Sequence, residues 1–282
     1  MNQEEFLLSQ YRLEVNAMKA AYLETILEVI PQLALRDVFF KGSAFKAWES
    51  SIDYVPELSD VDIHVWFEAD DGFEQTFPTL EAALEFSAKA EARFFAACPK
   101  PLHVPRVQLI ALNRLLGGEG FVASPASVTH SHFGLEYPSG RNTTPEAIRT
   151  VDAQSLLEEA EQISRIIRPE RMIDKHGKDL RSVLRDLSWR IGPLAARAIS
   201  VLGASYEDAW GHNRSSLLLK LEAQSQHDLV SSIRGFYWNA WTYFLSQDRD
   251  GNAARTAIRH GAKALEMGGQ VAQSWVRSGF EP

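Results

Sequence analysis

The sequence predicts an α+β fold in which a mixed sheet flanked by helices is followed by a C-terminal α-helical bundle. Up to about residue 112 short apolar segments alternate with segments of helical periodicity, and beyond about residue 150 the periodicity is helical almost throughout. These two observations predict one domain over residues 1–145 and a second over residues 146–282. With 282 residues, of which 45% are hydrophobic and 23% charged, the chain is long enough to bury a core in each domain.

The first domain is expected to begin with a helix and a strand. Apolar residues recur at helical spacing over residues 4–31, and Pro31 ends the pattern. The apolar segment 36–40 then predicts a strand, and residues 44–48 could open a second helix behind it.

A second strand is expected to start at Asp60, followed by a helix that Thr79 caps and that runs through Ala97. The apolar segment 104–112 predicts a third strand. Residues 117–145 are rich in Gly, Ser, Pro and His and predict loops with one irregular strand. The apolar positions of the helix include Leu80, Leu84, Phe94 and Phe95.

The second domain is expected to be a bundle that packs the apolar stripes of its helices together. Gly192-Pro193 should interrupt one stripe, because proline lacks a donor and clashes with the preceding turn. The predicted helices cover residues 152–167, 178–191, 194–203, 215–223, 227–246 and 253–278.

Two carboxylates alternate with apolar residues at the start of the second strand. Successive side chains of a strand point to opposite faces, so Asp60 and Asp62 share one face while Val61, Ile63 and Val65 enter the core. Two adjacent anionic groups need a counter-charge, and a hard divalent cation such as Mg²⁺ is the usual one. The alternative interpretation is an exposed strand face with two solvated acids.

A Gly-Ser pair follows the first strand. Glycine at position 42 permits close backbone approach, and the hydroxyl of Ser43 can donate to a phosphate oxygen. A helix starting directly behind the pair would also offer free backbone N–H groups to an anion. The alternative interpretation is an ordinary turn.

The order of these parts carries a family resemblance. A strand, Gly42-Ser43, the sixteen residues 44–59 and Asp-x-Asp on a second strand resemble the signature of the nucleotidyltransferase superfamily related to DNA polymerase beta. That superfamily includes antibiotic nucleotidyltransferases and small bacterial enzymes paired with toxins. The resemblance covers roughly residues 20–112, its motif lies within residues 41–65, and residues 49–58 are interpreted as a lengthened surface loop.

The resemblance implies a nucleotidyltransferase-type fold and a metal-dependent reaction. It assigns Gly42 and Ser43 to a nucleoside triphosphate, ATP or another, and assigns Asp60 and Asp62 to one or two Mg²⁺ ions. The implied activity transfers a nucleoside monophosphate, with AMP as the first choice, to a hydroxyl and releases pyrophosphate. His64 shares the face of the aspartates and is interpreted either as a contact to phosphate, metal or acceptor, or as a surface histidine.

One departure from the family concerns the third carboxylate that often comes from a later strand. The strand at 104–112 offers Arg106 and Gln108 on its polar face but no acid. Three explanations are open: a base from another segment, an enzyme without one, or a protein that binds nucleotide without turnover. Glu136 is the candidate base, and Glu119 is the alternative to it.

Two lysines are further candidates for nucleotide binding. Lys46 lies in the expected helix start, and Lys178 begins a helix of the second domain, where a basic residue is unfavourable to the helix dipole. Phosphate binding or an exposed, solvated face would each explain Lys178. The aromatic residues over 236–244 predict core packing or a homodimer face in preference to a base-stacking platform.

Net charge and targeting signals limit the partners. A formal net charge of -8 weighs against a nucleic acid acceptor, since phosphate backbones are bound by clustered Lys and Arg. We expect a small cationic molecule as acceptor, then a protein side chain, and RNA last. Residues 1–6 lack the pattern of a signal peptide and no apolar run of about eighteen residues occurs, which predicts a cytoplasmic protein without a membrane partner. The rival hypotheses are a catalytically impaired nucleotide-binding or partner-binding module, and a structural interaction protein built on the helical half.

Overall fold

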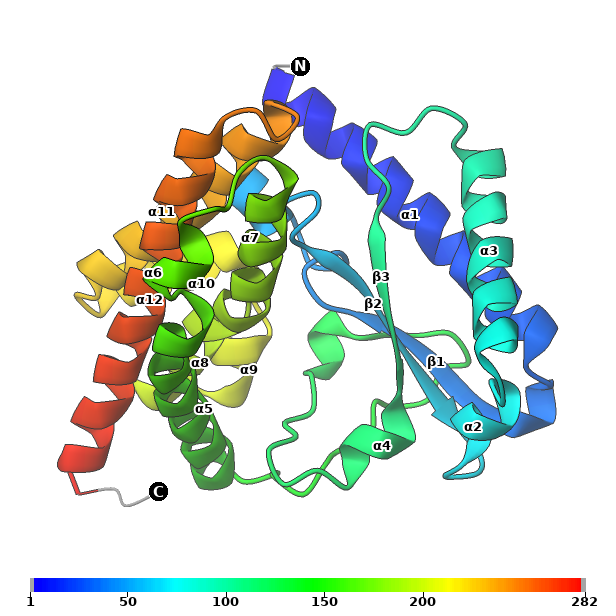
Figure 1. Ribbon diagram of the computed structural model, residues 1–282. Coiled ribbons are helices and arrows are strands. Elements are labelled where there is room, and N and C mark those ends of the chain that lie inside the picture. Colours follow the sequence, from blue (N-terminus) through cyan, green and yellow to red (C-terminus); the bar gives the residue numbers. More distant parts are fainter. Residues whose placement is uncertain (1–2, 280–282) are drawn as a thin grey trace. The chain divides into compact units, whose positions relative to one another are not determined.

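The computed structural model describes residues 3–279, which form two compact units (Figure 1). The first unit comprises Met1–Lys46 and Ser59–Asn142, and we call it the sheet unit. The second comprises Ala47–Leu58 and Thr143–Pro282, and we call it the helical unit. The second unit resumes close to the boundary predicted at residue 145, but it also takes residues 47–58, which the prediction had placed in the first domain.

The sheet unit contains a four-stranded mixed sheet of order β3-β2-β1-β4. β1 is antiparallel to both β2 and β4, whereas β2 and β3 run parallel. The mixed sheet with flanking helices agrees with the predicted α+β class, and β4 is the irregular strand expected in the loop region. The strands are β1 Leu35–Lys41, β2 Asp60–Phe67, β3 Arg106–Ala111 and β4 His130–Ser131.

Two long helices of the sheet unit, α1 Gln3–Val29 and α3 Leu80–Ala97, lie side by side (Figure 1). Met18 and Ala21 of α1 form a buried cluster with Phe94 of α3, on which Val107 of β3 also packs. The remaining elements of this unit are short: α2 Gly72–Thr76, α4 Leu112–Leu116 and the 3-10 helices η1 Gln32–Ala34 and η3 Ala126–Val128.

The ends of α3 are as predicted, but part of its predicted apolar face is wrong. The hydroxyl of Thr79 accepts a hydrogen bond from the backbone N–H of Ala82 at 3.2 Å and caps the helix. Leu80 and Leu84 are exposed, whereas Phe86 is buried with Ala90 and Phe94. Two residues correspond to about 200° of helix, so Leu84 and Phe86 point to opposite sides.

A buried carboxylate ties α1 to the connection between α3 and β3. Glu14 accepts hydrogen bonds from the backbone N–H groups of Leu102 and His103 at 2.6 and 3.2 Å, and its carboxylate lies 2.6 Å from Nδ1 of His103. Burial alone would raise the pKa of Glu14, but the hydrogen bonds from His103, Leu102 and Gln10 outweigh burial, so the pKa is lowered. Glu14 is therefore held in its charged form.

The helical unit is a bundle in which α12 packs against α11, α5 and α7. α7 and α8 are separated at Gly192-Pro193, as predicted, and α5 begins earlier than predicted because Thr144 caps it through the N–H of Ala147. The helices are α5 Pro145–Ile166, α6 Pro169–Met172, α7 Lys178–Ile191, α8 Leu194–Val201, α9 Tyr206–Trp210, α10 Arg214–Ala223, α11 His227–Leu245 and α12 Gly251–Arg277.

Residues 47–58 are part of the core of the helical unit, so the interpretation of 49–58 as a lengthened surface loop is wrong. A 3-10 helix, η2 Ser51–Asp53, lies within the segment. The carboxylate of Asp53 accepts from the backbone N–H of Ser215 at 2.7 Å and from its hydroxyl at 2.9 Å. The same carboxylate accepts from the N–H groups of Glu49 and Ser50. The apolar members of the segment are buried because they complete this core, among them Ile52, Tyr54, Val55 and Leu58.

A second buried carboxylate of the helical unit, Asp152, has a raised pKa. Asp152 of α5 accepts a hydrogen bond from Nε1 of Trp210 at 3.2 Å. Burial raises the pKa of Asp152 to about 6, although hydrogen bonds from Ser200 and Trp210 and the charge of Arg197 oppose that rise.

The aromatic residues of α11 are mainly core residues. Phe236, Tyr237, Trp241 and Tyr243 are buried, whereas Trp238 is exposed. Their burial supports the core-packing interpretation for these four side chains.

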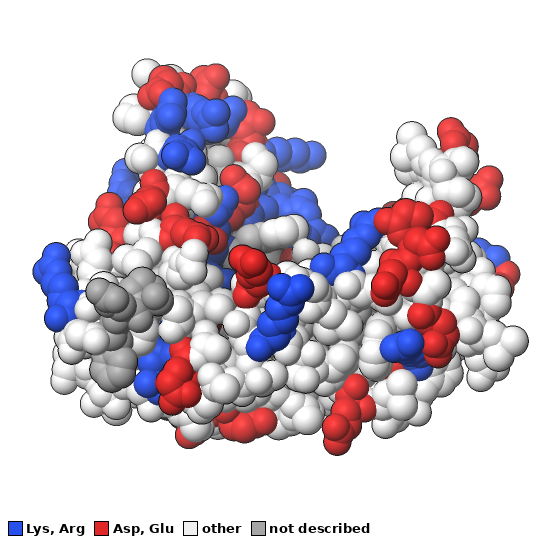
Figure 2. All heavy atoms as spheres, turned by 90° about the horizontal axis from the view of Figure 1, so that it is seen from below, with Lys and Arg blue, Asp and Glu red and all other residues white. Residues whose placement is uncertain are grey.

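Charged side chains of both signs are interspersed on the face that Figure 2 shows. Exposed ion pairs of the sheet unit include Arg114 with Glu74 and Arg36 with Glu68. Within residues 3–279, no helix combines the length and the apolar character that crossing a membrane requires.

Candidate functional site

The candidate site lies at the end of the sheet where β2 and β3 begin and β1 ends. In the parallel register Asp60 stands beside Arg106, and Asp62 stands beside Gln108. On the other side of β2, Lys41 is the antiparallel partner of Asp62. Val61, Ile63 and Val65 are fully buried, as the alternation predicted. The strand pattern therefore brings both aspartates and two cationic residues to one end of the sheet.

The backbone of Gly42 lies directly against the carboxylate of Asp62. Gly42 has φ +83, and a Cβ at this position would lie 2.0 Å from Oδ2 of Asp62. Any other residue would have to displace the carboxylate and would also be strained in this backbone conformation. The Gly-Ser pair and the Asp-x-Asp motif, separate in sequence, are thus in contact.

The loop after Gly42 is a turn, and the helix predicted over residues 44–48 is wrong. The N–H of Phe45 bonds to the carbonyl of Gly42 at 3.2 Å. Arg12 of α1 donates to the carbonyls of Ala44 and Lys46 at 2.6 and 3.0 Å, so a guanidinium takes oxygens that a helix would bond to later amides. The Gly-Ser pair therefore lies in a turn that Arg12 braces, and no helix begins directly behind it.

The counter-charges at the two aspartates come from the protein itself. Arg106 forms an ion pair with Asp60. Its Nε lies 2.5 Å from Oδ1, and its Nη2 donates to Oδ2 at 2.5 Å. The ammonium of Lys41 donates to the hydroxyl of Ser124 at 3.0 Å and attracts the charge of Asp62. Arg106 and Gln108 lie at alternate positions of β3, as predicted, and Arg106 forms an ion pair with Asp60 of β2.

The pKa of Asp62 is strongly raised. Burial raises its pKa to about 7, and the charge of Asp60 adds to the rise, whereas Lys41 and Arg106 oppose it. Burial likewise lowers the pKa of Lys41, against the attraction of Asp62. An aspartate with such a pKa is the kind of group found at functional sites.

His64 is buried, so its interpretation as a surface histidine is wrong. Its Nδ1 lies 2.7 Å from the hydroxyl of Tyr137. Burial lowers the pKa of His64 to about 3, and the charge of Lys41 adds to this effect. Glu136, the candidate base, directly precedes Tyr137 and is exposed.

The oxygen donors at this site suit a hard cation that takes its remaining ligands from phosphate and water. Two carboxylates and the amide oxygen of Gln108 lie on one face of β2 and β3, and oxygen donors of this kind suit Mg²⁺. Among residues 3–279, no group of three or more His, Cys, Asp or Glu side chains could hold a metal ion. Asp60 and Asp62 are the carboxylates that could hold Mg²⁺ at this site, and phosphate and water would have to supply its other ligands.

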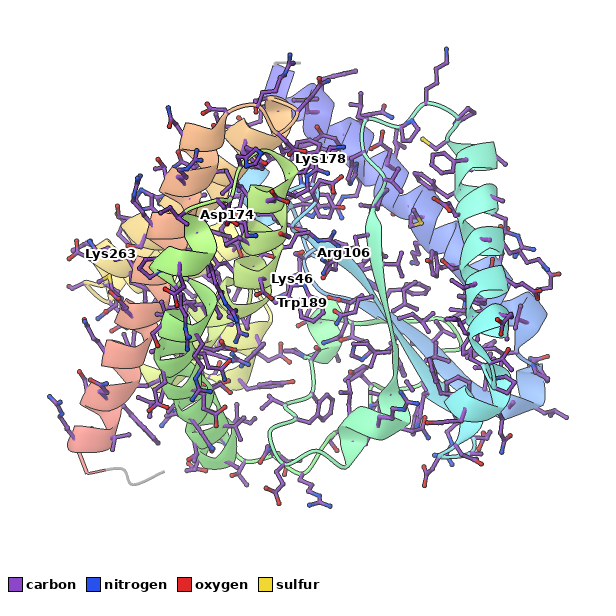
Figure 3. All side chains as sticks on the ribbon, viewed as in Figure 1. Lys46, Arg106, Asp174, Lys178, Trp189 and Lys263 are labelled. Carbon is purple, nitrogen blue, oxygen red and sulfur yellow. The ribbon has the colours of Figure 1, made fainter. Side chains whose placement is uncertain are left out.

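The other predicted site residues have different positions. Lys46 ends the Gly-Ser turn in the sheet unit, and Figure 3 labels it together with Arg106 of β3. Lys178, also labelled there, is exposed at the start of α7 in the helical unit, and its assignment to the nucleotide stays a prediction. Glu119 is exposed, and its backbone carbonyl accepts from Asn142.

A residue that the sequence analysis did not single out, Asp37, shapes the segment after β4. Its buried carboxylate accepts from the hydroxyl of Ser131 at 2.6 Å and from the N–H groups of His132, Phe133 and Leu135 at 2.9–3.0 Å. The signal in the sequence was a carboxylate directly before the apolar residues 38–40 of the strand. Through these bonds Asp37 fixes the segment that leads to Glu136 and Tyr137.

Comparisons with protein-family models, with curated proteins and with solved structures find no match to this chain.

Proposed function

We propose that the protein is a metal-dependent nucleotidyltransferase, with the nucleotidyltransferase-type fold that its two motifs imply. It moves a nucleoside monophosphate, AMP from ATP as the first choice, to a hydroxyl and releases pyrophosphate. The observation that carries the proposal is the contact of Gly42 with the carboxylate of Asp62, because it joins the two motifs at one end of the sheet. The acceptor is a small cationic molecule or a protein side chain, and the site of action is the cytoplasm.

The residues of the site have distinct roles in this reaction. Asp60 and Asp62 would hold Mg²⁺, which when bound neutralises phosphate charge and aligns the attacking and leaving oxygens. The hydroxyl of Ser43 donates to a phosphate oxygen, and Lys46 offsets negative charge. Glu136 takes the proton of the acceptor hydroxyl. Phosphoryl chemistry needs mainly positioning and electrostatic stabilisation, which such a set supplies.

Calorimetric titration with a nonhydrolysable ATP analogue tests the proposal. The wild-type protein should bind the analogue in Mg²⁺ and lose that binding in EDTA. The variant Asp60→Asn, Asp62→Asn should lose Mg²⁺-dependent binding while keeping its circular dichroism spectrum. Asp71→Asn is the matched control, because Asp71 is exposed and its side chain caps nothing.

Two outcomes would contradict parts of the proposal. Binding that persists in the double variant would contradict the metal site. A wild-type protein that binds no triphosphate would favour an interaction protein built on the helical half.

A second candidate is a nucleotide-binding or partner-binding module without turnover. It is favoured by Arg106 and Gln108, which occupy the strand positions where the family often supplies a third carboxylate. Pyrophosphate release separates the two candidates, measured with cationic small molecules and protein hydroxyls as acceptors. Release that falls in Glu136→Gln, with analogue binding unchanged, supports the enzyme, and binding without release from any acceptor supports the module.

A further inference from the structure

Arg106 occupies the carboxylate that the proposed metal needs. Its guanidinium contacts both oxygens of Asp60, each at 2.5 Å, from the adjacent parallel strand. The two side chains are 21% and 12% exposed, so the pair is shielded from water on most of its surface. The hydrogen bond from Nη2 to Oδ2 is charge-assisted, and hydrogen bonds of this kind are stronger than those between neutral groups.

A cation and Arg106 therefore compete for Asp60. Mg²⁺ is a hard ion that dehydrates reluctantly and binds carboxylates through their oxygens. Both oxygens of Asp60 already have a cationic partner, so metal binding must move the guanidinium away or share an oxygen with it. Asp62 alone, with Lys41 as its strand partner, is a poor site for a bare ion.

A displaced guanidinium needs another anion, and its planar fork matches phosphate as well as carboxylate. The Gly-Ser turn lies on this same end of the sheet, next to Asp62. A triphosphate held at that turn would bring phosphate oxygens to the strand ends from which Arg106 projects. The exchange of partners would leave Asp60 free for the metal at the moment when the phosphates arrive.

We propose that Arg106 exchanges Asp60 for the phosphates of the nucleotide, so that Mg²⁺ and triphosphate bind as a unit. The inference rests on the proposed function and adds to it a residue that positions phosphate and keeps bare metal out. It predicts effects of opposite sign when Arg106 is replaced. Metal should bind the nucleotide-free protein more tightly, and triphosphate should bind the metal-loaded protein more weakly.

Two titrations of the full chain test the exchange. In the first, Mn²⁺ is added to nucleotide-free protein and free Mn²⁺ is followed by electron paramagnetic resonance. Arg106→Gln should bind Mn²⁺ about tenfold more tightly than the wild type, and Arg106→Gln combined with Asp60→Asn should lose the gain. In the second, a nonhydrolysable ATP analogue is titrated in saturating Mg²⁺, and Arg106→Gln should bind it about tenfold more weakly.

Controls separate this result from a general disturbance of the site. Arg114→Gln removes another arginine of the sheet unit, which pairs with Glu74 at the surface, and should change neither titration. Arg106→Lys keeps the charge but not the planar fork. It should therefore still hinder Mn²⁺ binding, whereas its affinity for the analogue should fall below that of the wild type. It also keeps the test decisive if the Gln variant does not fold.

The outcomes distinguish the exchange from the proposed function. Two results overturn the exchange alone: Mn²⁺ binding equal in the wild type and both Arg106 variants, or weaker binding of both metal and analogue in those variants. A wild-type protein that binds no triphosphate in Mg²⁺ overturns the proposed function. Opposite shifts in the two titrations, with Arg114→Gln unchanged, support the exchange.

Discussion

Two buried carboxylates, Glu14 in the sheet unit and Asp152 in the helical unit, have pKa values shifted in opposite directions. Glu14 of the sheet unit is surrounded by donors, and its pKa is lowered despite burial. Asp152 of the helical unit has fewer donors against the same kind of burial, and its pKa is raised to about 6. Hydrogen bonds outweigh burial at Glu14 and keep it charged, whereas burial outweighs them at Asp152.

The units also use buried polar groups for different ends. In the sheet unit, Arg12 and Asp37 brace segments beside the candidate site. In the helical unit, Asp53 joins residues 47–58 to the start of α10. Arg12 and Asp37 thus shape the surface at the candidate site, whereas Asp53 fixes the packing of the helical unit.

Asp53→Ala should destabilise the helical unit most. The substitution leaves two backbone N–H groups and both donors of Ser215 without their acceptor, so we expect a loss of about 4 kcal/mol in the free energy of unfolding. Hydrogen exchange should show the loss in α10 and residues 47–58, with α1 and α3 protected as before. Loss of protection in both units together would break the contrast.

Gly42→Ala should damage the site of the sheet unit without unfolding it. The added Cβ meets Oδ2 of Asp62, so the carboxylate must shift, and affinity for the ATP analogue in Mg²⁺ should fall about a hundredfold. Gly117→Ala is the control, since a Cβ there meets nothing within 4 Å. Unchanged affinity in Gly42→Ala would show that the contact is unimportant for binding.

The helical unit should become more stable as pH falls from 7 towards 4. The folded pKa of Asp152, about 6, lies above the ordinary value of 3.8, so its favourable contribution is complete below 3.8 and is lost as pH rises through 6. The expected change is on the order of 2 kcal/mol. Denaturant unfolding at several pH values, read by hydrogen exchange in α5 and α9, should show this slope, and Asp152→Asn should flatten it.

Glu14 should contribute to the stability of the sheet unit with the opposite dependence on pH. The folded pKa of Glu14 lies below its ordinary value of 4.5, so its contribution is complete above 4.5 and is lost as pH falls through the folded value. Glu14→Gln should remove about 1–2 kcal/mol at pH 7 and less at pH 3, measured through the protection of α1. Equal destabilisation by Glu14→Gln at both pH values would contradict this sign.

Arg114→Gln should have the smallest effect. Its ion pair with Glu74 is exposed on both sides, and pairs of this kind contribute little to stability because water screens them. The protection of backbone amides from hydrogen exchange should be unchanged in both units. The affinity for the ATP analogue should stay at the wild-type value. A clear loss of stability in Arg114→Gln would show that exposed ion pairs stabilise the sheet unit.

Local signals in the sequence predicted the features that depend on neighbouring residues. Thr79 and Gly192-Pro193 act within one turn of helix, and the alternation around Asp60 and Asp62 acts within one strand, so these predictions were confirmed. The predicted helix over residues 44–48 failed because its carbonyls bond to Arg12, which lies 32 and 34 residues away. No local pattern reports a contact over that distance.

The same limit applies to the pairing of the site residues. The polar face of the third strand indicated that Arg106 and Gln108 lie together, but the register that places Arg106 against Asp60 is a property of the assembled sheet. Likewise, the contact between Gly42 and Asp62 needs the antiparallel pairing of β1 with β2.

Residues 47–58 make the order of synthesis matter for folding. Ile52 bonds to Arg214, 162 residues later, and Ser51 bonds to Trp241, 190 residues later. At typical rates of translation the segment waits about 10–30 s for its partners. During that interval β1 and β2 can pair and hold its apolar side chains in a closed, exposed loop, which makes this loop the place where chaperone binding and misassembly should concentrate.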